Sequence, residues 1–378
     1  MLLATLVKVL LLRMDGPSPL VRYPGKRELI RVHTRPPHLE TPFSVFNEGL
    51  ITPNDAFFVR YHLAGFPKSI DPEKFRLSVK GAVKTPLHLS LSELKVIAEQ
   101  VEVIAVNQCS GNSRGYSLPR VFGAQLGNGA MGKGRWAGLP LKAVILTNVK
   151  YVAFNGLDKP VFQSTTDFQK ALDIEHALSD EPMLAWEMNG EELPFLNGYP
   201  LKLIVPAYFG TYWVKHLSEI EVLDQPFQGH DSFFMNTGYR LPDNDCMCVA
   251  PETVAAKTLP ISTLPARSFI TNIKADDVLQ SNSVVELKGI VFDSDAGIKT
   301  VEVFIDGGQT WRSAKLGESL GRFSFREWKL PVSFIKTGLT ILMVRARNNQ
   351  GETQPALATL NHGGYRRNVI ENTPVNIV

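Results

Sequence analysis

The sequence predicts an α+β protein, with a mixed α/β domain followed by an immunoglobulin-like β-sandwich. Before about residue 260, strand-like apolar runs alternate with proline- and glycine-rich loops and a short helical segment. After it, β-branched runs follow one another with turn residues between them and almost no helical periodicity. We therefore expect a first domain over residues 21–260 and a sandwich over 261–378, with 1–20 as a possible leader remnant.

Distinct local signals mark the elements of the first domain. Aromatic, β-branched or alternating runs predict strands, and a serine before SELKVIAEQ predicts a helix N-terminus. We expect strands over 56–65, 75–83, 101–106 and 150–156, a helix capped by Ser92 over 92–100, and further mixed elements in LKLIVPA and HLSEIEVL. The glycine-rich stretch 123–138 should turn repeatedly or pack closely against a neighbour.

Four apolar runs predict the strands of the second domain. They are SVVELKGIVF, IKTVEVFIDG, RFSFREWKL and TILMVRARN, over 283–292, 298–307, 322–330 and 340–348. Turn residues separate them, as in a sandwich.

The composition predicts a globular protein without a nucleic-acid surface. Apolar residues make up 44% and charged residues 20% of the 378 residues, enough apolar side chain for a sizeable core. Lys plus Arg is 40 against 37 Asp plus Glu, a net charge of +3. A nucleic-acid binder would normally carry a basic face, so we expect any important cationic feature to be a local pocket. The apolar start, MLLATLVKVLLL, is too short to span a bilayer and shows neither a twin arginine nor an A-x-A cleavage site.

Three cysteines are present, and they differ in context. Cys246 and Cys248 lack the second pair that a zinc site needs, and we expect two packed or half-exposed thiols. No C-x-x-C-H motif occurs, so no c-type haem attachment is expected on this chain. Cys109 follows an apolar strand and opens a polar loop, where its thiolate would suit a soft transition metal. The alternative is a buried core thiol, although Arg114 would lower the thiol pKa and favour the thiolate.

Further candidates lie on other strands and loops. Arg60 and His62 are two apart on a predicted strand and would face one pocket, unless that strand edge is solvated. Lys215, in Trp213-Val214-Lys215, and Lys202 could each serve a phosphate, although a single lysine is more often a surface residue. Tyr239, taken alone, would more often be a packing residue.

Several stretches of the chain together carry a family resemblance. They are FFVRYHLAG, VNQCSGNSRG, GRWAGLPLKAV, AWEMNGEELPFLNGYPLKLIVPAYFGTYWVKHL, NTGYRLPDN, IDGGQTW and GETQP. In order and spacing they resemble the sulfite oxidase family of molybdenum enzymes, and within it the catalytic subunits of bacterial sulfite dehydrogenases (sulfite:cytochrome c oxidoreductases). The resemblance runs from about residue 20 to the C-terminus. It implies a molybdopterin-binding domain of the sulfite oxidase fold, followed by a dimerisation-type sandwich.

The resemblance also implies a set of cofactor contacts. Cys109 would be the molybdenum ligand, beside the dithiolene of one pterin. The residues implied to contact the cofactor are Phe58, Val59, Arg60, Tyr61, His62, Asp158, Trp213, Val214 and Lys215. Asn197 and Lys202 stand where many family members carry His and Arg, and Lys202 cannot grip a phosphate with a bidentate fork.

The substrate pocket and the reaction follow from the same resemblance. Arg60, Arg114 and Tyr239 would meet the substrate, with a further cation from Arg367 or its neighbour Arg366. The implied reaction is oxidation of sulfite to sulfate, with electrons passed singly to a separate c-type cytochrome. A homodimer or a heterodimer with a cytochrome subunit would fit. The periplasm is the expected compartment, with the cytoplasm as the alternative.

Other functions remain open from the sequence. A sulfane dehydrogenase subunit of thiosulfate oxidation is the nearest alternative. A methionine-sulfoxide reductase would lack the second domain, and a plant-type nitrate reductase would carry haem and flavin domains. A more remote alternative is a non-catalytic binding protein in which the sandwich is the functional part.

Overall fold

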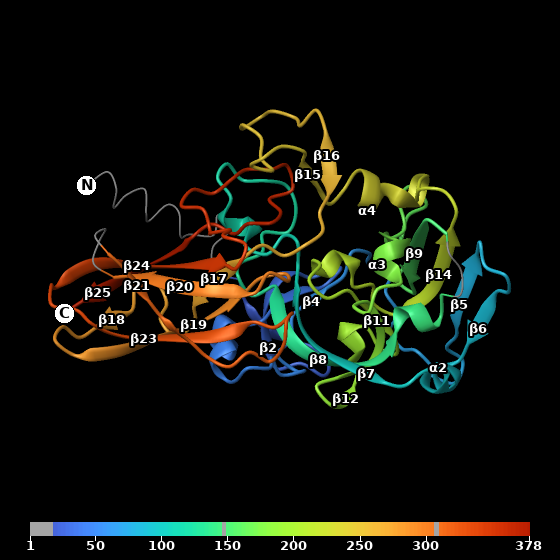
Figure 1. The fold of residues 1–378 in the computed structure, drawn as a ribbon, viewed down its shortest axis with the longest axis horizontal. Coiled ribbons are helices and arrows are strands. Elements are labelled where there is room, and N and C mark those ends of the chain that lie inside the picture. Colours follow the sequence, from blue (N-terminus) through green and yellow to red (C-terminus); the bar gives the residue numbers. More distant parts are fainter. Residues whose placement is uncertain (1–17, 146–148, 306–309) are drawn as a thin grey trace.

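The computed structural model describes residues 18–145, 149–305 and 310–378. The predicted leader remnant lies almost wholly outside the described residues, as does the centre of the IDGGQTW motif at 306–309. Figure 1 shows a β-sandwich beside a larger, mostly β domain that carries a few short helices. The predicted fold class is confirmed, and the longest helix among the described residues, α2 (Leu91–Ile97), has only 7 residues.

Three sheets and a short strand pair build the larger domain. A small N-terminal sheet consists of β1 (Leu20–Arg22), β2 (Glu28–His33), β3 (His38–Glu40) and β4 (Val59–Arg60), in that order. A second sheet has the order β10 (Gln169–Asp173), β9 (Tyr151–Gly156), β14 (Leu217–Leu223), β5 (Leu77–Gly81) and β6 (Leu87–Leu89). The third has the order β12 (Glu191–Glu192), β11 (Met183–Met188), β8 (Met131–Pro140) and β7 (Val101–Gln108), with β13 (Lys202–Ile204) also paired to β11. The pair is β15 (Arg240–Pro242) with β16 (Thr258–Pro260).

The helices are short and lie between strands. They are α2, α3 (Ile174–Ala177) and α4 (Phe233–Asn236), with 3-10 turns η1 (Phe43–Asn47), η2 (Arg114–Tyr116), η3 (Leu141–Ala143), η4 (Phe195–Asn197), η5 (Gly210–Tyr212) and η6 (His230–Ser232). The predicted cap of α2 at Ser92 is wrong, because the cap is Ser90. The Ser90 hydroxyl accepts the Glu93 N–H at 3.2 Å, and the Glu93 carboxylate accepts the Ser90 N–H at 2.7 Å. This reciprocal capping box requires an acidic residue three positions after the serine, and only Ser90 has one there.

The predicted strand over 56–65 is wrong for most of its length, since only Val59 and Arg60 form β4. The Tyr61 carbonyl is not hydrogen-bonded to a neighbouring strand, because two side chains occupy it instead. It accepts a hydrogen bond from the Arg60 guanidinium and lies 3.0 Å from His38 Nε2. The other predicted strands of this domain are present, with β7 extended to Gln108 and β5 shortened to Leu77–Gly81.

Two facing sheets form the sandwich. One has the order β17 (Arg267–Ile270), β19 (Val284–Phe292), β23 (Arg326–Ser333) and β22 (Lys315–Leu316). The other has the order β18 (Val278–Leu279), β25 (Glu371–Ile377), β24 (Gly338–Asn348), β20 (Ile298–Phe304) and β21 (Trp311–Ser313). Along β23, Trp328, Leu330 and Val332 are buried while the residues between them are exposed. This period of two places alternate side chains in the core between the sheets.

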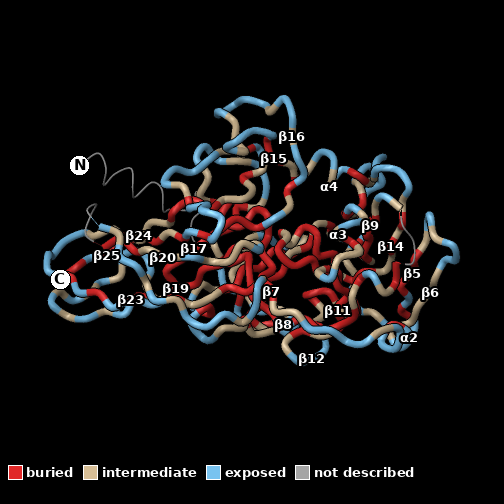
Figure 2. The backbone as a smooth tube through the Cα atoms, in the orientation of Figure 1, coloured by how far each residue is buried: buried red, intermediate tan, exposed pale blue. Residues whose placement is uncertain are grey.

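The two parts share a buried interface, which Figure 2 shows as a dense zone of buried backbone near the middle of the molecule. Phe292 and Phe325 of the sandwich belong to the large core of the first domain. The buried Lys133 ammonium donates to the Phe325 carbonyl at 3.0 Å, and the Val106 N–H donates to the Phe323 carbonyl at 2.9 Å. The predicted domain boundary near residue 260 stays a prediction.

Cys246 and Cys248 form a disulfide, so the prediction of two free thiols is wrong. They lie in the long loop between β15 and β16, which projects at the top of Figure 1. One residue separates the two cysteines. The left-handed backbone of Met247, with φ 49°, turns the chain back so that the sulfurs meet. Nothing in the spacing alone distinguished this turn from an extended C-x-C segment.

Candidate active site

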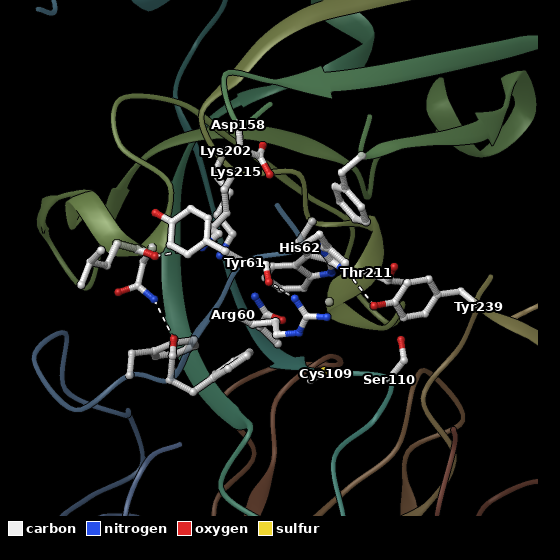
Figure 3. Close-up of a pocket in the computed structure, with 18 residues that line it drawn as sticks. Arg60, Tyr61, His62, Cys109, Ser110, Asp158, Lys202, Thr211, Lys215 and Tyr239 are labelled. Carbon is white, nitrogen blue, oxygen red and sulfur yellow. Dashed lines mark hydrogen bonds between the residues drawn. The ribbon is translucent and has the colours of Figure 1, made fainter. Parts of the chain in front are cut away.

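A pocket in the first domain collects most of the predicted site residues. Its empty volume, which includes space open to solvent, is about 630 Å³. Figure 3 shows Asp158, Lys202 and Lys215 gathered at one end, with Cys109 and Ser110 toward the other. The described residues that line it are Phe57, Phe58, Arg60, Tyr61, His62, Asn107, Cys109, Ser110, Asp158, Phe168, Leu196, Asn197, Lys202, Gly210, Thr211, Trp213, Lys215 and Tyr239.

Cys109 is a buried free cysteine directly after β7. Its N–H donates to the Ala130 carbonyl at 2.9 Å, and its own carbonyl accepts the Asn112 N–H at 3.0 Å. The Asn112 side-chain oxygen also accepts the Ala130 N–H at 3.0 Å. These bonds hold the loop against the neighbouring segment and fix the thiol at the pocket wall. A thiol held in this way can ligate a soft metal ion placed in the pocket.

His62 and Tyr239 form a hydrogen-bonded pair, with His62 Nε2 2.6 Å from the Tyr239 hydroxyl. The imidazole stacks on Phe168 at a centroid distance of 3.5 Å. Burial, helped by the nearby Arg60 cation, lowers the pKa of His62 well below its usual value. Burial likewise raises the pKa of the Tyr239 phenol. Both groups are therefore neutral near neutral pH, and the pair offers a ligand uncharged hydrogen-bond donors and acceptors.

Arg60 supplies the guanidinium at this wall of the pocket. One of its nitrogens donates to the Tyr61 carbonyl, which fixes the side chain, and other N–H groups remain to face a ligand. Arg60 and His62 both line the pocket, as predicted, although the strand that was expected to align them ends at Arg60. The residues directly after β4, and not a longer strand, therefore bring His62 to the pocket beside Arg60.

The opposite end of the pocket holds two lysines, Lys202, which is buried, and Lys215, which is half-buried. Lys215 Nζ lies 3.0 Å from the centroid of the Tyr61 ring and donates to the Leu196 carbonyl at 3.1 Å. Lys202 Nζ lies 4.4 Å from the Trp136 ring. Burial lowers the pKa of Lys202 to about 7, and repulsion by nearby Lys26 adds to the effect.

Asp158 is the carboxylate that lines this end. Burial raises its pKa to about 6, and the neighbouring Lys215 opposes the rise. The lysines therefore outnumber the lining carboxylate. An anionic group such as a phosphate would relieve their mutual repulsion.

Asn197 is braced by protein groups on both sides of its amide. Its side-chain oxygen accepts from Lys26 Nζ at 2.5 Å, and its side-chain nitrogen donates to the Phe58 carbonyl at 3.0 Å. Lys26 is itself buried and donates as well to the Asn54 carbonyl at 2.5 Å. Lys26 thus joins Lys202 and Lys215 in one cationic cluster, and the N-terminal sheet supplies it.

Three buried polar atoms at the pocket have no hydrogen-bond partner among the described residues. They are Asn107 Oδ1, Ser110 Oγ and Thr211 Oγ1. An unpaired buried polar group costs free energy, so its placement against a pocket indicates a polar ligand. A free thiol, a lysine cluster and these unpaired atoms together fit a cofactor with a soft metal, an anionic phosphate and a polar ring system.

Four of the predicted residues do not line the pocket. Val59 and Val214 are buried in apolar clusters. Arg114 is buried beside it, where its Nε donates to the Gly363 carbonyl at 2.5 Å and its guanidinium lies 4.9 Å from the Tyr365 ring. Arg367 has a buried Nε without a partner among the described residues.

Arg366, the alternative to Arg367, does not line the pocket either. Its side chain lies 3.6 Å from Glu352, and its backbone N–H donates to the Ser110 carbonyl at 3.1 Å. The segment between β24 and β25 is therefore tied to the loop of Cys109. The substrate roles of Arg114 and Arg367 stay predictions.

The sequence reasoning missed several residues that the fold brings to the site. Lys26 had no local signal, because its burial depends on contact with Asn197, far along the chain. Phe168 is a lining residue whose stacking on His62 is purely tertiary. Tyr365 lies parallel to Tyr239 at a centroid distance of 5.0 Å and supports it from outside the pocket. Ser110 could have been found, since it adjoins Cys109.

Comparisons with known proteins identify both domains. A family model for an oxidoreductase molybdopterin-binding domain matches residues 63–231, and one for a Mo-co oxidoreductase dimerisation domain matches 258–377. Sulfite oxidase of Gallus gallus is 30% identical over 317 residues, covering 80% of this chain and 67% of that protein. The chain belongs to the sulfite oxidase family.

Other family members and a solved structure agree with this assignment. Mitochondrial sulfite oxidase of Homo sapiens is 31% identical over 338 residues, covering 84% of this chain and 59% of that protein. The chain thus spans about 59% of the length of the human relative. The crystal structure of the sulfane dehydrogenase SoxCD from Paracoccus pantotrophus shares the fold, with a TM-score of 0.74 and 21% identity over 93% of this chain and 90% of that one.

Among the described residues, no three His, Cys, Asp or Glu side chains gather closely enough to hold a metal ion together. Within the same residues, no helix has the length and apolar character needed to cross a membrane.

The buried lysines predict how stability depends on pH in the chain without cofactor. In the folded chain, burial lowers the pKa of Lys26, Lys170 and Lys202 to about 7, against an ordinary value of 10.5. Between these values the unfolded chain binds more protons than the folded chain. The free energy of unfolding should therefore rise with pH, by up to about 1.4 kcal/mol per pH unit for each lysine.

Urea unfolding of cofactor-free protein at several pH values across this window measures the slope. Lys202→Met should reduce the slope, because it removes one of the groups that take up protons on unfolding. Lys74→Met, at an exposed position, is the matched control and should leave the slope unchanged. Equal slopes in the wild type and Lys202→Met would contradict the prediction.

Proposed function

We propose that this protein is a molybdenum-dependent sulfite dehydrogenase that oxidises sulfite to sulfate and passes electrons singly to a separate c-type cytochrome. The observation that carries the proposal is a single pocket that holds Cys109 and Arg60 beside the neutral His62–Tyr239 pair, with a buried lysine cluster at the other end. The family membership supports the same chemistry.

Different residues of the chain would bind the metal, the phosphate and the substrate. Cys109 would ligate the metal, while Lys26, Lys202 and Lys215 would neutralise the cofactor phosphate. When bound, the molybdenum–pterin cofactor supplies the two-electron redox change. Arg60 would hold the oxygens of the sulfite anion by charge-assisted hydrogen bonds. Tyr239 and His62 would orient the anion and hold or move a proton between the phenol oxygen and Nε2.

The partner and the compartment belong to the same proposal. The match to a dimerisation domain over 258–377 supports an oligomer, either a homodimer or a complex with a cytochrome subunit. A c-type cytochrome acceptor would place the reaction in the periplasm.

One observation favours a second candidate, a sulfane dehydrogenase. Arg114 and Arg367 do not line the pocket, and Phe168 forms part of its wall. A pocket with a single lining arginine and an aromatic wall also suits a sulfane-sulfur chain, which carries less charge than sulfite.

The decisive experiment is a metal analysis joined to two assays. Protein expressed in a host that makes the pterin cofactor should contain molybdenum and reduce cytochrome c when sulfite is added. The second candidate instead predicts turnover with a sulfane-sulfur carrier protein and little with sulfite. A protein free of molybdenum after such expression would refute both.

Tyr239→Phe should lower kcat for sulfite by about 10- to 100-fold, because it removes the hydroxyl bonded to His62 while keeping the ring. Steady-state kinetics over a range of pH measure the effect. Tyr212→Phe is the matched control, since Tyr212 is also a buried tyrosine but does not line the pocket. Equal losses in the two variants would show that the effect is structural.

A further inference from the structure

The Cys246–Cys248 disulfide lies on the surface, with Cys246 exposed and Cys248 half-buried. Asn244 holds the ring from one side, since its side-chain nitrogen donates to the Cys248 carbonyl at 2.9 Å and its side-chain oxygen accepts the Cys248 N–H at 3.1 Å. Met247, between the cysteines, adopts the left-handed backbone region and packs against the large core. Cys246 is thus an exposed residue whose sulfur lies 3.4 Å from the Asn244 side-chain oxygen, while the backbone around it is fixed.

The disulfide loop is connected to the active site by a short series of contacts. The Val249 N–H donates to the Leu360 carbonyl at 2.8 Å. The next residue, Asn361, exchanges two hydrogen bonds of 2.9 Å with the backbone of Tyr365. Tyr365 in turn stacks on Tyr239, which lines the pocket. A change at the disulfide therefore bears on the segment that supports Tyr239.

We propose that the Cys246–Cys248 disulfide is a reversible modification site for sulfite. The inference rests on the proposed function only in so far as that function brings sulfite to the protein. The sulfur lone pair of sulfite attacks Cys246 Sγ, the S–S bond breaks, and Cys248 leaves as a thiolate. Cys246 becomes an S-sulfonate, so the step balances without any added oxidant or reductant. In the reverse step the Cys248 thiolate attacks Cys246 Sγ and expels sulfite.

Charge around the loop gives the reaction a recognisable dependence on salt. Asp243 and Asp245, both exposed, directly precede the disulfide in the chain, and their negative charges repel an approaching sulfite anion. Salt screens such exposed charges, so the adduct forms faster as ionic strength rises. Once formed, the S-sulfonate is repelled by the same carboxylates. The opened ring also releases the left-handed turn at Met247, and the contact from Val249 to Leu360 loosens.

Mass spectrometry of the full oxidised chain, incubated with sulfite in the absence of an electron acceptor, tests the site. The expected result is one added SO₃ group per chain on Cys246 and one new free thiol besides Cys109. Sulfate as a control anion gives no adduct, and neither does the Cys246→Ser/Cys248→Ser double variant. Absence of the adduct, or an equal adduct in the double variant, overturns the inference.

Hydrogen exchange tests the link to the active site. Sulfite treatment speeds exchange of the Val249 amide, whereas amides of the distant strand β19 (Val284–Phe292) keep their rates. Unchanged exchange at Val249 in a chain that carries the adduct overturns the proposed link. Neither measurement uses turnover, so a chain that forms the adduct but never oxidises sulfite refutes the proposed function and leaves this inference standing.

Discussion

Cys109→Ser is expected to abolish molybdenum retention and sulfite oxidation together. A serine hydroxyl is harder and far less acidic than a thiol, so it does not replace a thiolate on a soft metal. The loss of turnover should exceed about 1,000-fold, the scale on which removal of an essential catalytic group acts. Metal content, the thiolate-to-metal absorption band and sulfite-dependent cytochrome c reduction measure the effect.

The two other cysteines provide the control for this experiment. Cys246→Ser/Cys248→Ser removes the disulfide and leaves Cys109 in place, so molybdenum content should stay at the wild-type value. If Cys109→Ser retained molybdenum and turnover, Cys109 would be a core thiol, and the non-catalytic interpretation of the chain would gain support.

Arg60→Gln is expected to lower kcat/KM for sulfite by roughly 100-fold, equivalent to about 3 kcal/mol, because charge-assisted bonds to an anion are lost in the transition state. Arg60 is the only arginine among the described residues that line the pocket, so no neighbouring guanidinium takes over its role. Arg60→Lys should recover part of the loss through its charge, but not the planar arrangement of donors.

Arg135→Gln is the matched control, since Arg135 pairs with Glu102 at 2.7 Å on the surface. Exposed ion pairs contribute little, so this variant should stay within about twofold of the wild type. Thermal unfolding of both variants separates a loss of fold from a loss of function. A kcat/KM for Arg60→Gln equal to that of the control would remove Arg60 from the substrate site.

Local patterns predicted the sandwich and many of the strands. The strand predicted over 322–330 is present as β23, although it starts at Arg326 and extends to Ser333. Its period of two is a property of neighbouring residues. The capping box at Ser90 was equally local, and the error of two residues came from weighing the serine without its acidic partner. The early end of β4 could not be predicted from local sequence. It depends on a contact between the Tyr61 carbonyl and His38, which lies on another strand.

The candidate site likewise contains residues that local motifs predicted and residues that they missed. Motifs pointed to Cys109, Arg60, His62 and Tyr239, and the structure brings all four to one pocket. Lys26 and Phe168 were missed, because their places at the site follow from contacts with residues far along the chain.

What the sequence by itself determined about this protein is its family, the order of most of its elements and Cys109 as the candidate metal ligand. These follow from residue types and spacings that are complete within short segments. Only the tertiary structure decided that Arg114 and Arg367 do not line the pocket, that Lys26 completes the lysine cluster, and that Cys246 and Cys248 are joined. The physical reason is that burial and partnership depend on distant parts of the chain meeting in space, and residue spacing alone does not record where they meet.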